Sequence, residues 1–184
     1  VQSNIKWPND IHISGKKVAG ILTEARMDAD QTRDLVLGIG LNINGRAEDW
    51  PEELQTIATS IRQETGSQKD ANRFTDALAG RVMLAYEQFV SDSYRSHLKE
   101  KWTSYDAREG RNVSLFQGEA KIEGKACGIV PHGALIVERL ALGIAPMLGA
   151  HQLMHALGEG LGQTIGQGLD HDGVVIVMRF FITA

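Results

Sequence analysis

The chain has 184 residues and a formal net charge of −4, from 19 basic and 23 acidic side chains. Hydrophobic residues make up 42% and charged residues 23%, as in ordinary globular domains, so the composition argues against intrinsic disorder. The basic excess that nucleic-acid-binding proteins carry is absent, so these residues are not expected to bind DNA themselves.

The sequence also bears on the cellular compartment. No signal peptide is visible, and the longest apolar run, residues 174–182, is interrupted by Arg179 and falls short of the ~20 residues that span a bilayer. We therefore expect no membrane association and a cytoplasmic location. Cys127 is the one cysteine, and its apolar neighbours Ala126 and Ile129 predict a buried thiol in a reducing compartment.

The N-terminal part of the chain is predicted to form a sheet, with strands at residues 5–7, 10–13, 17–26 and 35–43. Pro8 separates the first two strands, and the turn residues 14–16 join the next two into a hairpin. The last strand is almost continuously apolar, which is typical of a strand covered on both faces. Its residues Gly38 and Gly40 indicate that a ligand or another backbone approaches closely there.

Two helices and a small all-β segment are expected next. A first helix, starting near Ala71, has apolar residues at helical spacing: Leu78, Val82, Ala85 and Phe89. A second helix repeats the pattern with Tyr94, Leu98, Trp102 and Tyr105. The period then falls to two, with strands predicted at residues 113–116, 120–122 and 134–137, joined by glycine-containing turns.

The residues that carry chemistry are grouped in three strings. Lys6-Trp7-Pro8-Asn9-Asp10 comes first, Lys17-Val18-Ala19-Gly20-Ile21-Leu22 follows, and Gly38-Ile39-Gly40-Leu41-Asn42 is the third. Lysines suit phosphate oxygens, Asp10 suits a magnesium ion, and Asn42 offers further hydrogen bonds, so the set is suited to a polyanion. Each residue alone is better explained as a solvated surface group or a turn former, so only the ordered combination is informative.

That ordered combination resembles the biotin protein ligase family, over about residues 1 to 139. KWPND, a KxxGIL string beginning seven residues after its aspartate, and GIGLN stand in the family's order. Residues 51–54 and 57–60 look like the forms found in Gram-positive bacteria, and residues 124–135 resemble the family's C-terminal barrel. Lipoate ligases share the broader fold and a similar adenylation, but KWPND together with GIGLN points to biotin.

The resemblance implies a two-step reaction. The carboxylate of biotin attacks the α-phosphate of ATP to give biotinyl-adenylate and pyrophosphate, and a carrier lysine then attacks the mixed anhydride. By position in its motif, Lys17 is the catalytic group, since a positioned ammonium neutralises two anions that must meet. The family's biotin site implies Lys17, Gly20, Gly38 and Leu41.

For ATP, the resemblance implies Lys6, Asn9, Asp10 and Asn42, with magnesium held by Asp10. Trp50 has two interpretations that the sequence does not separate: stacking on adenine, or packing of a loop tryptophan on the helices. The implied acceptor is the biotin carboxyl carrier protein of acetyl-CoA carboxylase. The sequence is compatible with a homodimer but does not decide the oligomeric state. DNA contact is expected only through an N-terminal domain that these residues lack.

We therefore predict an α+β fold: a mixed sheet packed with helices, lacking the N-terminal half of the catalytic domain, followed by a small β-barrel. The domains are predicted at residues 1–108 (catalytic), 109–139 (barrel) and 140–184 (an unassigned glycine-rich tail). In the tail, His151, His155 and Glu159 share a helical spacing that suits zinc, although its glycines disfavour a helix.

Because the family's glycine- and arginine-rich loop would lie upstream of KWPND, this chain alone is expected to be inactive and to bind biotin weakly. Two alternatives to a ligase stay open. The chain is also compatible with a biotin-sensing regulatory or dimerisation module without turnover, and with a truncated or frameshifted product without function.

Overall fold

The computed structural model describes residues 1–28, 31–117, 120–131, 133–139, 143–146 and 173–181. They divide into two compact units. The first contains residues 1–3, residues 9–86 and strand β9 (Gly173–Phe181), and the second contains residues 4–8 and the described residues between 87 and 146. The predicted domain boundaries after residues 108 and 139 are a different division of the chain, and they stay a prediction.

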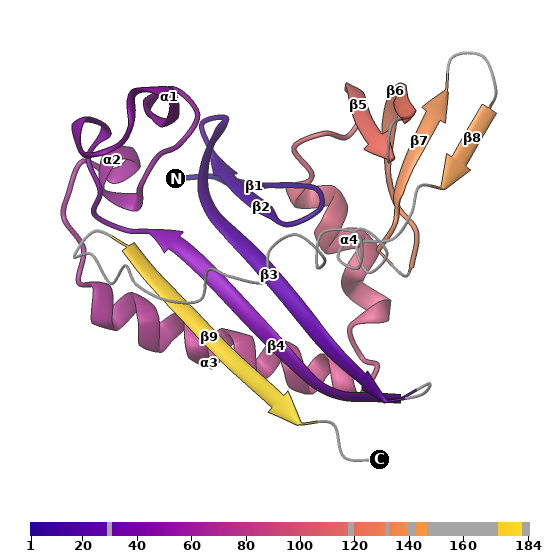
Figure 1. Cartoon of the computed structure of the whole chain (residues 1–184), viewed down its shortest axis with the longest axis horizontal. Coiled ribbons are helices and arrows are strands. Elements are labelled where there is room, and N and C mark those ends of the chain that lie inside the picture. Colours follow the sequence, from indigo (N-terminus) through magenta and orange to yellow (C-terminus); the bar gives the residue numbers. More distant parts are fainter. Residues whose placement is uncertain (29–30, 118–119, 132, 140–142, 147–172, 182–184) are drawn as a thin grey trace. The chain divides into compact units, whose positions relative to one another are not determined.

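The first unit is built on a sheet. Its strands follow one another in the order β2 (Asp10–Ile13), β3 (Lys16–Asp28), β4 (Gln31–Asn42) and β9. These three pairings are antiparallel. In Figure 1, β9 runs along the free side of β4, so a strand from the unassigned tail completes this part of the sheet.

The turn between β2 and β3 explains the tightness of the hairpin. Ser14 and Gly15 have φ values of 52° and 80°, and positive φ at both central residues is the pattern whose twist matches that of paired strands. This agrees with the turn expected at residues 14–16.

Short helices follow the sheet, and one long helix covers it. They are η1 (Ala47–Asp49), α1 (Glu52–Gln55), α2 (Ile61–Thr65) and α3 (Ala71–Val90). Figure 1 shows α3 running along β3 and β4. Leu78, Val82 and Tyr86 of α3 pack against apolar residues of the two strands, including Ile21 and Ile39.

The inward face of α3 differs from the predicted stripe. Leu78 and Val82 lie in the core as expected, but the next inward residue is Tyr86, whereas Ala85 and Phe89 are exposed. The spacings 78–82–86 and 78–82–85–89 both suit a helix, so periodicity did not distinguish them.

Among the described residues, α3 covers one face of the sheet, and the opposite face is more exposed. Leu22 projects from the face away from α3 and is 50% exposed, whereas Ile39 on the α3 face is 7% exposed. The continuous apolar run at residues 35–43 therefore does not reflect cover on both faces by the described part of the chain. The uncovered face is the one that carries the glycines of the third motif.

The second unit contains α4 (Arg95–Tyr105) and a four-stranded sheet. The strand order is β5 (Asn112–Gln117), β6 (Ala120–Ile129), β7 (Leu135–Arg139) and β8 (Gly143–Pro146). Its core consists of Ala126, Leu135 and Val137. Within the described residues β5 and β8 are not paired with each other, so the predicted closed barrel is not confirmed.

Trp7, from the first motif, belongs to this second unit. Most of β1 (Ser3–Lys6) lies here too, with Ile5 bridged in parallel to Asp106. Trp7 packs against the β5–β7 core, and its indole Nε1 donates to the Gly133 carbonyl at 3.0 Å. The tryptophan of KWPND is therefore an anchor of the β-rich unit.

Cys127 differs from expectation. It is free, but its side chain is partly exposed rather than buried, with Sγ 3.4 Å from the Lys125 carbonyl oxygen. Among the described residues, no helix has both the length and the apolar character needed to cross a membrane.

The packing of the small sheet depends on Gly124. A Cβ at Gly124 would overlap the Glu138 carbonyl oxygen and lie 2.6 Å from Val137 Cγ1. Because backbone cannot yield as a flexible side chain does, we expect Gly124→Ala to lower the free energy of unfolding by about 1–3 kcal/mol. Urea denaturation of the chain would measure this change.

Gly80→Ala is the matched control for that experiment. Gly80 is exposed on α3, and a Cβ there meets nothing within 4 Å. Alanine should raise the free energy of unfolding by about 0.5–1 kcal/mol, because glycine is a poor helix residue. An unchanged stability in Gly124→Ala would contradict the packing described here.

Candidate active site

The β2–β3 hairpin brings Lys17 and Asp10 together. Lys17 Nζ lies 2.6 Å from Asp10 Oδ1. Gly20 is the residue directly across the ladder from Asp10, and a Cβ at Gly20 would lie 3.2 Å from both Cε and Nζ of Lys17. The lysine side chain therefore extends across the one position of the strand that has no side chain of its own.

An extra residue in β3 explains how Lys17 reaches Gly20. Residues three apart on a regular strand project to opposite faces. Here Ile11 pairs with Ala19 and His12 pairs with Lys17, so Val18 has no partner and forms a bulge. Val18 and its neighbour Ala19 are both buried with Ile13, and Lys17 projects to the face of Gly20. The bulge therefore places Lys17 and Gly20, which are three residues apart in KxxG, on the same face of the strand.

The backbone of Lys17 is fixed even though its side chain is partly exposed. Its N–H donates to the Ile57 carbonyl at 2.8 Å, and its carbonyl accepts from the Thr59 N–H at 2.8 Å. The side chain is 47% exposed and that of Asp10 is 19% exposed. The ammonium is therefore held at its base and remains open to a ligand at its tip.

Gly20, Gly38 and Asn42 share the face onto which Lys17 projects. Gly20 pairs with Gly40, and Gly38 and Asn42 lie two residues to either side of Gly40, so alternation places all of them on one face. A Cβ at Gly40 would meet nothing within 4 Å, and one at Gly38 would meet only Leu22, at 3.8 Å and beyond. The glycines make an open floor beside the ion pair.

The two asparagines of the motifs connect this floor to neighbouring segments. Asn9 Nδ2 donates to the Ile21 carbonyl at 2.8 Å, and the Ile21 N–H donates to the Asn9 carbonyl at 2.9 Å. Asn42 Nδ2 donates to the Thr59 carbonyl at 3.1 Å. Both amides therefore support the local backbone in addition to any role toward a ligand.

Leu41, Lys6 and Trp50 are three further residues that the sequence analysis singled out. Leu41 packs against Ile13, Val18 and Ala19, which is the core side of the sheet. Lys6 belongs to the second unit. Trp50 lies with its ring against Gly45, where a Cβ would be 3.1 Å from the indole. Its backbone carbonyl accepts from Gln55 Nε2 of α1 at 3.0 Å, so in this structure Trp50 is a packed loop residue tied to a short helix.

His12 is a neighbour of the ion pair that the sequence analysis missed. Its Nδ1 lies 3.1 Å from the Gly15 carbonyl oxygen, so Nδ1 carries the proton, since a carbonyl only accepts. Its Nε2 is buried without a hydrogen-bond partner in the described chain, 4.0 Å from Asp10 Oδ2. The Asp-x-His alternation on a strand is the signal that indicates this neighbour.

Comparison with known proteins bears on the family of the chain. A model of the biotin/lipoate A/B protein ligase family matches residues 1–42, which contain all three motifs. A biotin protein ligase from Aquifex aeolicus, solved with biotin, superposes with a TM-score of 0.70 and 31% identity over 82% of this chain and 60% of that one. This chain belongs to the biotin protein ligase family.

Two curated relatives extend the comparison. The bifunctional ligase/repressor BirA of Bacillus spizizenii is 38% identical over 142 residues, which cover 75% of this chain and 42% of the relative. The biotin–[acetyl-CoA-carboxylase] ligase of Paracoccus denitrificans is 35% identical, over 72% of this chain and 55% of the relative. The chain thus spans about half the length of these biotin protein ligases.

The tail residues whose spacing would suit zinc on a helix, His151, His155 and Glu159, lie outside the described residues. Within the described part of the chain no group of three or more His, Cys, Asp and Glu side chains is placed to hold a metal ion. Among the described residues, Lys17 and Asp10 form an ion pair beside the open glycine floor.

Proposed function

We propose that the protein containing this chain is an ATP-dependent ligase that joins biotin to a lysine of the biotin carboxyl carrier protein of acetyl-CoA carboxylase. The observation that carries the proposal is the position of Lys17, 2.6 Å from Asp10 and across Gly20, beside the open face of β3 and β4. The relatives named as biotin–carboxylase ligases, and an Aquifex aeolicus ligase solved with biotin and ATP, support it.

Lys17 is the catalytic group in this proposal. In the first step a carboxylate oxygen of biotin bonds to the α-phosphorus of ATP, the bond to the β-phosphate breaks, and pyrophosphate leaves. Both reactants are anions, so an ammonium between them offsets their repulsion and stabilises the charge that grows on the phosphoryl oxygens. Because the backbone of Lys17 is fixed, little reorganisation is needed.

In the second step the carrier lysine attacks the acyl carbon of biotinyl-adenylate, and AMP leaves. Gly20 and Gly38 would let biotin approach the sheet, because no side chain covers them. Leu41 would act as a wall residue through the backbone of β4, since its side chain faces the core. Lys6, Asn9, Asp10 and Asn42 are the proposed contacts to ATP.

Asp10 is suited to hold magnesium. Oδ1 is engaged by Lys17, whereas Oδ2 has no hydrogen bond to the described residues. Magnesium in phosphoryl-transfer sites is commonly held by one or two carboxylates together with phosphates and waters, so a single free oxygen fits. When bound, the ion would supply positive charge to the phosphates.

A second candidate function is a biotin-sensing regulator without turnover. This candidate is supported by the relatives that are named bifunctional ligase/repressors. Dimerisation and DNA contact belong to this candidate and remain proposals.

Pyrophosphate release by the full-length protein separates the two functions. We expect release that requires both ATP and biotin, followed by transfer of biotin to the apo carrier domain, detected by mass spectrometry. Biotin binding without biotin-dependent pyrophosphate would favour the sensor. Lipoate in place of biotin is the matched control, and equal release with lipoate would contradict the substrate assignment.

A further inference from the structure

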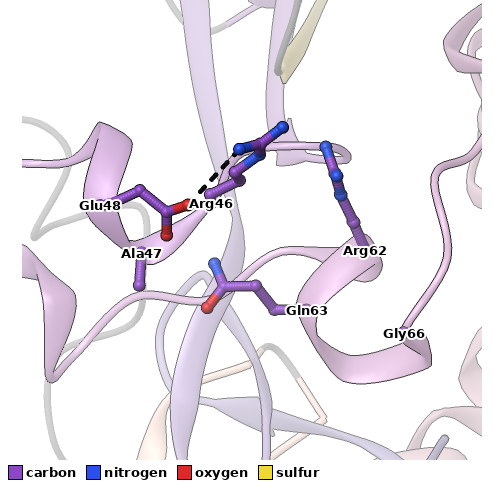
Figure 2. Close-up of a pocket in the computed structure, with 6 residues that line it drawn as sticks. All are labelled: Arg46, Ala47, Glu48, Arg62, Gln63 and Gly66. Atoms are coloured by element: carbon purple, nitrogen blue, oxygen red, sulfur yellow. Dashed lines mark ion pairs between the residues drawn. The ribbon is translucent and has the colours of Figure 1, made fainter.

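A separate pocket lies in the first unit, beyond the end of β4. It has a volume of about 480 Å3, opens to solvent, and is lined by Arg46, Ala47, Glu48, Arg62, Gln63 and Gly66 (Figure 2). None of these residues belongs to the three motifs, and none has a role in the proposed ligase reaction.

The walls of the pocket are fixed by buried hydrogen bonds. Ser60, which is fully buried, donates from its hydroxyl to the Gly45 carbonyl at 2.6 Å. Gln63 Nε2 donates to the same carbonyl at 3.1 Å, and the Arg62 N–H donates to the Ile43 carbonyl at 2.8 Å. The loop before η1 is therefore tied to α2, and the pocket between them is a built feature.

The two arginines leave most of their hydrogen-bonding capacity unused. In Figure 2 the side chains of Arg46 and Arg62 extend toward the same end of the pocket. The Arg62 guanidinium has no hydrogen bond or ion pair with the described residues. That of Arg46 has only Glu48 Oε1 at 3.6 Å, longer than the ~2.8 Å of a strong charged hydrogen bond.

We propose that this pocket binds a phosphate-type oxyanion, with Arg46 and Arg62 as its cationic ligands and Glu48 as a weak internal competitor. Guanidinium groups remain charged at all relevant pH values and present paired donors that match the oxygens of phosphate. The lining side chains carry two positive charges and one negative charge, so the empty pocket attracts an anion. This site is independent of the ligase assignment.

Isothermal titration calorimetry of the chain with inorganic pyrophosphate tests the proposal. Arg62→Gln should weaken binding by about tenfold or more, because it removes a charged donor group. Glu48→Gln should strengthen binding by roughly two- to fivefold, because it removes the competing carboxylate. Glu48 is 68% exposed in its side chain, so its replacement should not disturb folding.

Arg81→Gln is the matched control. Arg81 is an exposed arginine of α3, and its replacement changes the net charge by the same amount as Arg62→Gln. An equal loss of affinity in Arg81→Gln, or no loss in Arg62→Gln, would overturn the site. Arg62→Lys, which keeps the positive charge, should bind pyrophosphate with intermediate affinity. That result would show that the loss of affinity in Arg62→Gln does not come from a folding defect. A larger loss of ATP affinity than of pyrophosphate affinity in Arg62→Gln would identify a nucleotide phosphate as the ligand of this pocket; a larger loss for pyrophosphate would identify a free phosphate.

Discussion

Replacing Lys17 with alanine in the full-length protein is expected to lower the rate of biotinyl-adenylate formation by about 100- to 1,000-fold. This is the usual cost of removing one positioned group that stabilises developing charge. The free energy of unfolding should fall by only about 1 kcal/mol or less, because the ion pair with Asp10 is partly exposed. Single-turnover measurement of biotin-dependent pyrophosphate release, alongside urea denaturation, separates the two effects.

Lys16→Ala is the matched control for that variant. Lys16 is the adjacent lysine, and among the described residues its Nζ has a hydrogen bond with the Gln55 carbonyl alone, at 3.3 Å. It should keep the adenylation rate near the wild-type value while losing the same charge. A Lys17→Ala protein that forms the adenylate at the wild-type rate would remove Lys17 from the chemistry.

Gly20→Ala is expected to lower the rate of adenylation by about 10- to 100-fold without unfolding the protein. The new Cβ would lie 3.2 Å from Cε and Nζ of Lys17, so the flexible end of the lysine must move away from Asp10. Small misplacements of a reacting group cost rate of this order. Because the displaced atoms end a flexible side chain, the free energy of unfolding should change by less than about 1 kcal/mol.

The kinetic signature distinguishes displacement of Lys17 from collision with biotin. Displacement lowers the adenylation rate even at saturating biotin, whereas collision alone raises the biotin KM. Gly80→Ala, far from the hairpin on the exposed side of α3, serves as the control and should leave both parameters unchanged. A normal rate at saturating biotin in Gly20→Ala would refute the displacement.

Much of the local structure could be predicted from the sequence, because turn chemistry and periodicity are local signals. Strands β2, β3 and β4 and helices α3 and α4 lie close to the predicted ranges. The Ser14–Gly15 turn has the positive φ values that its residues favour. Lys17, Asp10 and Gly20 lie close together in the structure, and their roles in binding and catalysis stay a prediction.

Long-range features could not be predicted in the same way. The pairing of β9 with β4 joins residues far apart in the sequence, and an apolar run does not name its partner strand. The bulge at Val18 reverses the alternation that a strand prediction assumes, so its effect on Lys17 appears only in the structure. Leu41 was placed at the biotin wall by its motif, yet its side chain faces the core.

Residues outside the motifs also escaped the sequence analysis. His12 lies beside Asp10 because alternate residues of β2 share a face, which a search for isolated motifs does not consider. Arg46 and Arg62 are separated by a loop and two short helical segments, and only the fold brings them to one pocket.

A crystal structure of the full-length protein with a non-hydrolysable biotinyl-adenylate analogue tests the central claim most directly. The account predicts the ligand on the face of Gly20 and Gly38, with Lys17 Nζ within about 3 Å of an oxygen of its acyl-phosphate group. A ligand bound elsewhere, or a Lys17 side chain turned toward solvent while the ligand is in place, would contradict it.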